Sequence, residues 1–370
     1  MTTAQGVPKH EQVRQVLERE IRSGLVKPGE RLASEAELVE RFGVSRITVG
    51  RAVRELQRAG LVERRAGSGT YVRQPTPAPG GLSFGLLIPD LGETEIFEPI
   101  CQGMMASPLA REHALLWGSP ARPGDGGGAR EERTWQLCEQ YIQRKADGVF
   151  FAPLERTPSK DETNRRVVEA LEAARIPIVL LDRPVLGYPG RGGQDLVGID
   201  NARAGYLITD HLLRMDCRRI AFVAVPDSAA TVDMRESGYR EAHHGWGLPV
   251  DRSLSRRFDP AEAAAVAELM ATQRPDGIVC ANDWTAARLM HTLLDLGHAV
   301  PDDVRIVGID DVEYAKLLPV PLTTFRQPTR EIGAAALAAM LERVAHPELP
   351  PRDILLHGRL VVRRSCGAPD

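Results

Sequence analysis

The segment FGVSRITVGRAVRELQRAG, residues 42–60, has the pattern of an amphipathic helix that follows a capping serine. Ser45 is a favoured N-cap residue, and a helix from there to about Ala59 gathers its apolar side chains on one inward face. The inward residues are Val49, Ala52, Val53 and Leu56. The outward residues, at i, i+4 spacing, are Arg46, Gly50 and Arg54, with Ile47, Thr48 and Arg51 beside them. Gly50 therefore leaves one outward position of an arginine-rich helix without a side chain.

The flanking sequence predicts two helices before this segment and two short strands after it. An apolar stripe predicts a helix over residues 11–24, and Ser34 opens a second helix with a capping box. Residues 61–65 and 70–73 have the composition of short strands around a glycine-containing tip. The order helix, helix, tight turn, helix and two-stranded wing predicts a winged helix-turn-helix for residues 1–73.

The outward side chains of the third helix suit contacts to DNA. A helix fits the major groove and its first turn reaches deepest, so Arg46 is placed to fork onto a guanine. Ser45 and Thr48 can hydrogen-bond a phosphate or a base edge. The candidates for contacts to the phosphate backbone are Arg51, Arg54, Arg64, Arg65 and Arg73. A small solvated domain with surface arginines is the alternative; the order and spacing of the elements favour DNA.

Charge and composition differ between the two parts of the 370-residue chain. Residues 1–75 carry 14 Lys and Arg against 9 Asp and Glu, and the remainder carries 33 against 41. A basic head favours a polyanionic partner. No apolar run approaches the roughly 18 residues that span a bilayer, the N-terminus lacks the apolar core of a secretion signal, and the five cysteines show no zinc spacing. We expect a cytoplasmic protein with no membrane association, no metal and no cofactor.

Five motifs occur within residues 10–73: PGERL, SEAEL, GVSRxTV, LxxAGLV and GxGTYV. Together they resemble the DNA-binding domain of GntR-family transcription regulators. The resemblance implies that Arg46 and Thr48 contact operator DNA. It also implies that the wing glycines, Gly67 and Gly69, let the wing tip enter the minor groove. Ser34 at the start of the SEAEL motif is included in the implied set of DNA-contacting residues.

Three residues depart from the GntR pattern. Ala33 stands where the family usually has proline, and Ala36 and Gly50 stand where it often has arginines that contact DNA. One hypothesis is that Gly50 lets the helix sit closer to the groove, with Arg46 as the main base reader and Arg51 on phosphate. The alternative is that the glycine arose by drift and carries no information.

The remainder of the chain has the pattern of a parallel α/β fold. A Pro/Gly-rich stretch, residues 74–81, is expected to be a semi-rigid linker. From residue 82 to 370, apolar strand candidates alternate with amphipathic helices, which is typical of parallel sheets covered on both faces. The strand candidates are SFGLLIP, ALLWG, DGVFFAP, IPIVLLD, LVGID, RIAFVAVP, DGIVCAND and VRIVGIDD. This length suits two doubly wound lobes.

Polar residues follow five of these strands, at the edge where parallel sheets bind ligands. They are Asp90, Asp182-Arg183, Asp200-Asn201, Asn282-Asp283 and Asp310-Asp311. Such side chains suit a neutral polyhydroxylated ligand, but an aspartate at a strand end also caps the next helix. Capping is favoured for Asp200-Asn201 and Asp283. A ligand role is favoured for Asp182-Arg183, because Pro184 follows and no helix starts at once.

Longer motifs, among them FGLLIPD, IPIVLLDRP, VGIDNARAGYLITDHLL and DGIVCANDWTA, resemble the LacI-type effector domain over residues 83–366. That domain is similar in fold to periplasmic sugar-binding proteins. The resemblance implies ligand contacts from Asp90, Asp182, Arg183, Arg235, Asn282, Asp310 and Gln327. Phe97 stands where an aromatic ring often stacks on the sugar, and Trp284 is expected near the cleft. The acidic and arginine side chains favour a sugar over a purine.

The same resemblance implies how the chain divides between two lobes. It assigns residues 82–185 and 328–350 to the first lobe, and residues 190–325 with the C-terminal strands to the second. The chain then crosses between the lobes three times, which makes a hinge. Inserts over residues 119–129 and 184–195 depart from the pattern. The second insert follows Arg183, and either the ligand or another subunit is a candidate for its contacts.

The resulting interpretation is a multidomain transcription regulator, a repressor of carbohydrate-utilisation genes. A homodimer binds a roughly palindromic operator through its heads, and a sugar or sugar derivative releases it. The first alternative is an activator or corepressor-dependent repressor of the same architecture. The second, from a different class, is a sugar-binding protein or an enzyme. No GxSxG sequence, metal cluster or Lys/Ser pair appears, so no catalytic residue is predicted.

Overall fold

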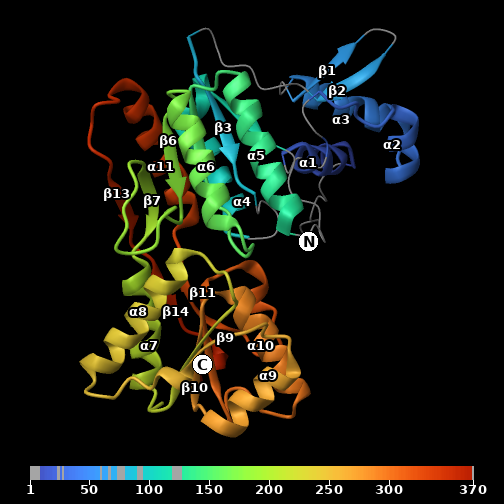
Figure 1. Ribbon diagram of the computed structural model, residues 1–370. Coiled ribbons are helices and arrows are strands. Elements are labelled where there is room, and N and C mark those ends of the chain that lie inside the picture. The colour runs from blue at the N-terminus through green and yellow to red at the C-terminus, as the bar shows by residue number, and fades with distance from the viewer. Residues whose placement is uncertain are drawn as a thin grey trace. The chain divides into compact units, whose positions relative to one another are not determined.

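A computed structural model of the chain describes residues 9–22, 26, 29–58, 61–65, 68–72, 80–89, 95–118 and 127–368 (Figure 1). Gly67 and Asp90, which the sequence places at the wing tip and at a strand end, lie outside the described residues. The chain forms two compact units, residues 1–86 with 112–120 and residues 87–111 with 121–370. No helix within the described ranges is long and apolar enough to cross a membrane.

The head is a winged helix-turn-helix, as predicted. Its elements are α1 (Lys9–Arg22), α2 (Glu35–Phe42), α3 (Arg46–Arg58), β1 (Val62–Arg65) and β2 (Gly69–Val72). The capping box at the start of α2 is confirmed, since Ser34 Oγ accepts from the Glu37 amide at 3.3 Å and Glu37 Oε2 accepts from the Ser34 amide at 2.7 Å. Gly43 ends α2 in the left-handed region, at φ 59°. Strands β1 and β2 pair in antiparallel fashion and form the wing.

One apolar cluster holds the head together. The inward face of α3 packs on α1, α2 and the wing, as its helical spacing predicts. The cluster consists of Val13, Leu17, Leu32, Leu38, Val49, Ala52, Val53, Leu56, Val62 and Val72. Because these residues come from every element of the head, the cluster fixes the face of α3 that points away from it.

The sequence predicts that Gly50 leaves an empty position on the outward face of α3. In the structure, Gly50 is buried instead. A Cβ atom built on Gly50 would have Arg54 Nη1 as a neighbour at 3.6 Å, an ordinary van der Waals distance. The guanidinium of Arg54 therefore lies over the space next to the glycine, one helical turn away. The i, i+4 relation between the two residues explains the contact.

We expect Gly50→Ala to raise the free energy of unfolding of the head by about 0.5–1 kcal/mol. Alanine removes the entropic penalty of a glycine inside a helix, and its methyl group fits beside Arg54 without displacing it. Chemical denaturation of the full chain, followed by far-ultraviolet circular dichroism, measures the change. A loss of stability would show that the glycine backbone itself is required.

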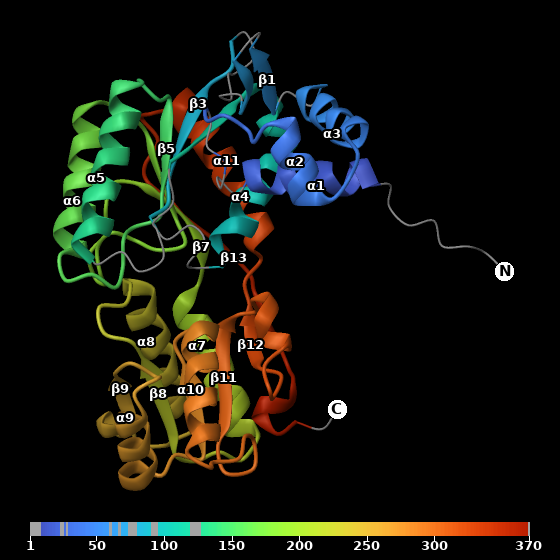
Figure 2. The same cartoon turned by 90° about the vertical axis from the view of Figure 1, so that its right-hand side faces the viewer.

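The first sheet of the body has six strands in the order β13-β7-β6-β5-β3-β4. They are β3 (Ser83–Leu87), β4 (Ala114–Trp117), β5 (Gly148–Phe151), β6 (Ile178–Leu181), β7 (Asp195–Ile199) and β13 (Asp353–Leu356). Its helices are α4 (Phe97–Ala106), α5 (Gly127–Gln143), α6 (Lys160–Ala173) and α11 (Thr329–Ala345). Figure 2 shows α5 and α6 on one side of β5, and α4 with α11 on the other. We call this sheet and its helices the first lobe.

The second lobe is built in the same way on a six-stranded sheet of order β14-β12-β11-β10-β8-β9. Its strands are β8 (Ile220–Ala224), β9 (Ser255–Arg257), β10 (Gly277–Cys280), β11 (Arg305–Asp310), β12 (Thr323–Arg326) and β14 (Arg359–Val361). Its α-helices are α7 (Asn201–Arg214), α8 (Ala230–Gly245), α9 (Ala263–Glu268) and α10 (Asp283–Asp295). Its short helical turns are Arg252–Leu254, Leu269–Gln273, Glu313–Lys316 and Arg364–Cys366. A further short turn, Pro108–Glu112, lies between α4 and β4 of the first lobe. Only β14 runs antiparallel to its neighbour among the pairs described.

The boundary between the lobes differs from the predicted one. Strand β7, residues 195–199, was expected in the second lobe but pairs with β6 in the first sheet. The C-terminal strands also divide, because β13 pairs with β7 while β14 pairs with β12. The crossings therefore fall after β7, after β12 and between β13 and β14. Their number, three, agrees with the prediction, and all of them lie at one edge of the two sheets.

Candidate functional site

The outward face of α3 presents a basic surface. The side chain of Arg46, the first residue of α3, is 80% exposed, and its Nε lies 3.3 Å from Glu35 Oε2. Arg64 on the wing shares the same carboxylate at 3.5 Å. Exposed ion pairs of this kind contribute little free energy, so both arginines are free to exchange Glu35 for DNA. We call Ser45, Arg46, Ile47, Thr48, Arg51, Arg54, Arg64 and Arg65 the recognition surface.

The serines predicted to contact DNA are also helix caps. Ser34 caps α2, whereas Ser45 Oγ accepts from the Thr48 amide at 3.3 Å and lies 2.8 Å from Thr48 Oγ1. The structure therefore brings Ser45 and Thr48 together beside Arg46 at the first turn of α3. That arrangement offers two hydroxyls and a guanidinium to one ligand.

The wing adds a cation and a glycine that its backbone requires. Arg65 pairs with Glu63 at 2.8 Å and lies over the Tyr71 ring, with its Cζ 4.4 Å from the ring centroid. Gly69 has φ 125°, and a Cβ there would lie 2.7 Å from Arg31 Nε. A side chain at position 69 would thus be strained and crowded. On α3, Arg51 pairs with Glu55 at 3.1 Å and keeps 60% of its side chain exposed.

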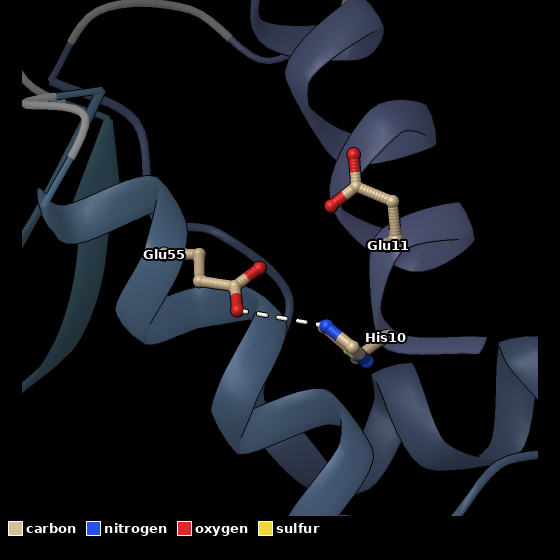
Figure 3. A group of neighbouring side chains, drawn as sticks. All are labelled: His10, Glu11 and Glu55. Carbon is tan, nitrogen blue, oxygen red and sulfur yellow. Dashed lines mark ion pairs between the residues drawn. The ribbon is translucent and has the colours of Figure 1, made fainter. Parts of the chain in front are cut away.

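His10, Glu11 and Glu55 form a small group at the junction of α1 and α3 (Figure 3). Their nitrogen and oxygen atoms are close enough to hold a metal ion, but the carboxylates of Glu11 and Glu55 already pair with arginines. Glu11 accepts two hydrogen bonds from Arg14, at 2.9 and 2.6 Å, which hold the pKa of Glu11 at about 2. Glu55 lies 3.6 Å from His10 Nε2 and also pairs with Arg51. The contact between His10 and Glu55 is therefore the one in this group that joins α1 to α3.

The body brings five predicted ligand residues together at the carboxyl ends of strands from both sheets. Asp182 and Arg183 follow β6, Asp310 ends β11, Gln327 follows β12, and Arg235 lies on α8. Gln327 Nε2 donates to Asp310 Oδ1 at 2.7 Å, and Arg235 Nη2 lies 3.9 Å from the same oxygen. We call these five residues the cleft cluster. All of them except Asp310 are less than 6% exposed, and Asp310 is nearly buried.

Close helix packing positions Arg235 in this cluster. A Cβ on Gly205 of α7 would lie 2.0 Å from the Arg235 carbonyl oxygen, so only glycine lets α8 approach α7 this closely. The guanidinium is then held by Asn201 Oδ1 at 2.8 Å and by the Ala281 carbonyl oxygen at 2.6 Å. Arg235 is therefore a fixed donor with its last nitrogen toward Asp310.

Burial dominates the electrostatics of the cluster. It raises the pKa of Asp182 and raises that of Asp310 to about 8, although Arg183 and Arg235 oppose the shift at Asp182, and Arg235 opposes it at Asp310. Glu155 behaves differently, because Arg183 and Arg156 outweigh its burial and lower its pKa to about 2. At neutral pH an ionised Glu155 thus lies next to a cluster whose own carboxyl groups are costly to ionise.

Two buried acceptors of the cluster lack hydrogen-bond partners among the described residues. They are Asp182 Oδ1 and Gln327 Oε1. Buried polar atoms are almost always satisfied in folded proteins, so a missing partner indicates a ligand or ordered water. The backbone supports this, since Asp182, Asp310 and Asp311 adopt φ of 67°, 129° and 57°. Non-glycine residues in this region cost roughly 1–3 kcal/mol each and gather at ligand sites.

The caps at the strand ends are partly as predicted. Asp200 caps α7, with Oδ1 accepting from the Arg203 amide at 2.9 Å. The cap of α10 is Asn282, so the expected capping role of Asp283 is wrong. Asp283 is buried, and its carboxylate accepts from Thr324 Oγ1 at 2.6 Å and from the Val312 amide at 3.1 Å. Because the Oδ1 of Asn282 is committed to the cap, its amide nitrogen remains for a ligand.

Phe97 is the first residue of α4 and is fully buried. Arg183 Cζ lies 5.1 Å from the centroid of the ring, so the guanidinium covers the face on which a sugar was expected to stack. Arg183 also donates to Glu155 Oε1 at 2.7 Å. Phe97 and Glu155 therefore hold Arg183 from two sides.

Glu155 was missed by sequence reasoning, although it follows the strand end of β5 like the predicted residues. Its second oxygen accepts from the Ala229 amide of the second lobe at 3.1 Å. The next residue, Arg156, donates its amide to the Asp227 carbonyl at 2.7 Å and lies over the Trp284 ring, 5.4 Å from its centroid. Residues 155 and 156 thus bridge the two lobes. The signal that would have found them is the acidic-basic pair four residues after a buried strand.

The insert over residues 184–195 contributes to a pocket beside Arg183. The pocket has a volume of roughly 130 Å³ and includes Pro184, Val185 and Gly187 in its wall. Lys160 and Asp161 at the start of α6 and Asp233 on α8 line it as well. The sequence left two candidate contacts for this insert, the ligand and another subunit. In the structure, the insert lines a pocket together with Arg183 of the cleft cluster.

We expect the unfolding free energy of the ligand-free protein to fall as the pH rises from about 5 to about 8. Asp310 has a folded pKa above its ordinary 3.8, so the folded state binds more protons than the unfolded state between these values. Asp182 and Asp283 shift in the same direction, and the pKa of Glu155 lies below this range. Urea denaturation at several pH values measures the slope. Asp310→Asn should flatten it; an unchanged slope would assign it to other groups.

Comparison with known proteins agrees with both halves of this architecture. Residues 9–72 match the bacterial regulatory proteins of the gntR family, and residues 209–366 match the periplasmic binding protein-like domain. The arabinose metabolism transcriptional repressor of Geobacillus stearothermophilus is 28% identical over 370 residues, 97% of this chain and 98% of that protein. The HTH-type transcriptional repressor PurR of Vibrio vulnificus is 32% identical over 236 residues, 63% of this chain and 68% of that protein.

Solved structures show the same fold. The transcriptional regulator CelR in complex with cellobiose has a TM-score of 0.65 at 23% identity, over 97% of this chain and 100% of that one. A LacI family transcriptional regulator from Enterococcus faecium with bound ribose has a TM-score of 0.61 at 24% identity, over 76% of this chain and 98% of that one. The expected multidomain class, a winged helix-turn-helix with a two-lobed α/β domain, is thereby confirmed.

Proposed function

This chain belongs to the family of transcriptional repressors that join a GntR-type winged helix-turn-helix to a periplasmic-binding-protein-like effector domain, and we propose that a sugar controls its hold on operator DNA. The observation that carries the proposal is the pairing of two surfaces in one chain. The recognition surface is basic and exposed, whereas the cleft cluster is buried and has unsatisfied acceptors. The first suits a polyanion and the second suits a small ligand with hydroxyl donors.

A sugar is the ligand class that the cleft cluster supports best. Asp182 Oδ1 and Gln327 Oε1 are acceptors, and a hydroxyl group can donate to each. Arg183 and Arg235 each face a carboxylate, so their charges are already balanced and a phosphate group gains little. The names of the relatives agree in part, since they include an arabinose repressor and a ribose-bound regulator, whereas the PurR relative names no sugar. The ligand is therefore an unphosphorylated sugar or sugar derivative.

The proposed contacts to DNA follow the predicted set. Arg46 hydrogen-bonds a base in the major groove. Ser45 and Thr48 hydrogen-bond a phosphate or the edge of a base. The remaining proposed contacts are Ser34, Arg51, Arg54, Arg65, Gly67 and Gly69. One α3 helix offers few base contacts, so the protein binds a palindromic site as a homodimer. The proposed location is the cytoplasm. Its parts are the head over 1–73, the linker over 74–81 and the effector domain over 82–370.

The sugar acts by changing the equilibrium between lobe arrangements. It bonds to residues of both lobes, with Asp90 and Asn282 completing the proposed site. Phe97 acts through Arg183, whose guanidinium covers its ring. The bridge formed by Glu155 and Arg156 lies next to Arg183, so binding there alters the free energy of the interlobe contacts. Coupling of this kind is typically about 1–3 kcal/mol, or roughly 5- to 150-fold in operator affinity. The sign of the change distinguishes a repressor from a corepressor-dependent regulator.

A thermal-shift screen of the full-length protein identifies the sugar. The panel contains unphosphorylated pentoses, hexoses and disaccharides, their phosphates, and purine bases. We expect one unphosphorylated sugar to raise the unfolding temperature in proportion to the logarithm of its concentration. Stabilisation by a sugar phosphate or a purine alone would contradict the ligand class. Product analysis of the same mixtures tests the enzyme alternative, which any turnover would support.

A further inference from the structure

An exposed isoleucine stands at the first turn of α3. Ile47 is 81% exposed, although the other aliphatic side chains of that helix, among them Val49 and Leu56, are buried. A single exposed apolar residue is ordinary on a protein surface. Ile47, however, lies between Arg46 and Thr48, within the turn that the proposed function places deepest in the major groove. Its neighbours on the recognition surface are otherwise charged or hydroxylated.

The major groove offers one apolar group to such a side chain, the C5-methyl group of thymine. The arginines around Ile47 fix the kind of partner, because they suit phosphates on both sides of the groove. Arg46 and Arg51 keep 80% and 60% of their side chains exposed, and Arg64 on the wing keeps 66%. A branched aliphatic group on the same surface as these exposed cations can gain free energy from DNA only by contact with an apolar atom.

We propose that Ile47 is a specificity-determining residue that packs on a thymine methyl group in each operator half-site. This inference rests on the proposed function and adds a base preference to it. Gly50 supports the assignment, because it places no side chain of its own on the turn after Ile47 and Arg54 lies back beside it. The half-site is then read by a hydrogen-bonding fork from Arg46 and an apolar contact from Ile47.

Replacement of thymine by deoxyuridine, which removes only the methyl group, tests the contact. The probe is a duplex selected in vitro from a random pool by the full-length protein, and each thymine is replaced in turn. We expect one symmetric pair of replacements to weaken wild-type binding roughly fourfold per half-site, the effect of about one buried methyl group. Ile47→Ala should bind the thymine duplex with a similar loss. It should be insensitive to deoxyuridine at that position.

Two controls separate this result from misfolding and from general weakening. Ile47→Ala should unfold at the wild-type temperature, because the side chain is exposed. Leu317→Ala truncates a side chain that is 78% exposed outside the head, and it should keep the full response to deoxyuridine. The inference is overturned if no thymine methyl group matters to the wild type, or if Ile47→Ala keeps the same sensitivity. Failure to select any duplex would overturn the proposed function as well.

Discussion

Arg46→Ala is expected to reduce operator affinity more than any other single substitution. An arginine that forks onto guanine contributes about 1–3 kcal/mol of discrimination, and a dimer uses two of them. The expected loss is therefore about 2–6 kcal/mol, or roughly 30-fold to more than 10,000-fold. The fold should not suffer, since the side chain is 80% exposed and its ion pair with Glu35 is solvated. Fluorescence anisotropy with a labelled operator measures the change.

Two further substitutions make this result specific. Arg46→Lys keeps the charge and loses the planar fork, so it should retain binding to scrambled duplex and lose preference for the operator. Arg218→Ala removes an arginine of the body that is 48% exposed, and it should leave operator affinity unchanged. If Arg46→Ala bound the operator like wild type, α3 would not be the base-reading helix.

Asp182→Asn is expected to weaken sugar binding by roughly 5- to 13-fold. A hydrogen bond to a charged acceptor contributes about 1–1.5 kcal/mol more than one to the neutral amide oxygen that asparagine keeps. The Oδ1 atom of Asp182 is buried and has no hydrogen-bond partner in the part of the chain that the structure describes, so the sugar is its proposed donor. The same substitution should not lower the unfolding temperature of the free protein. Burial raises the pKa of Asp182, so its ionised form destabilises the fold at neutral pH, and a neutral amide removes that cost.

Asp200→Asn is the matched control for this effect. It makes the same chemical change at the end of a neighbouring strand, where Asp200 caps α7 and asparagine caps a helix equally well. Isothermal titration calorimetry should give wild-type sugar affinity for this variant and weakened affinity for Asp182→Asn. Equal affinities for all three proteins would remove Asp182 from the site.

The sequence predicted the elements whose signal is local. The capping box at Ser34, the inward face of α3 and the eight apolar strand candidates all depend on neighbours within one element. Strands β9 and β12 were not predicted, because their sequences, SRR and TTFR, lack apolar alternation. They are strands because β9 pairs with β8 and β12 pairs with β11. The prediction that β7 belongs to the second lobe was wrong for the same reason, since β7 pairs with β6 in the first sheet. Which sheet a strand joins depends on partners that are distant in sequence.

The site was predictable in outline and not in detail. The structure brings together Asp182, Arg183, Arg235, Asp310 and Gln327, whose role in sugar binding stays a prediction. Four of them lie at the carboxyl ends of parallel strands, and Arg235 lies on α8. Side-chain partners decided the rest. Helix α10 takes Asn282 as its cap and frees Asp283 to bond Thr324, a contact that spans 41 residues. No local pattern carries that information.

The most direct test of the account is operator binding by the full-length protein with and without the sugar found in the thermal-shift screen. At fixed salt, the protein should bind the selected operator more tightly than a scrambled duplex of equal length. Saturating sugar should weaken operator binding by roughly 5- to 150-fold and leave the affinity for the scrambled duplex nearly unchanged. The sugar itself should be recovered without chemical change. Equal affinity for the two duplexes, or an operator affinity that the sugar does not alter, would contradict a sugar-controlled repressor.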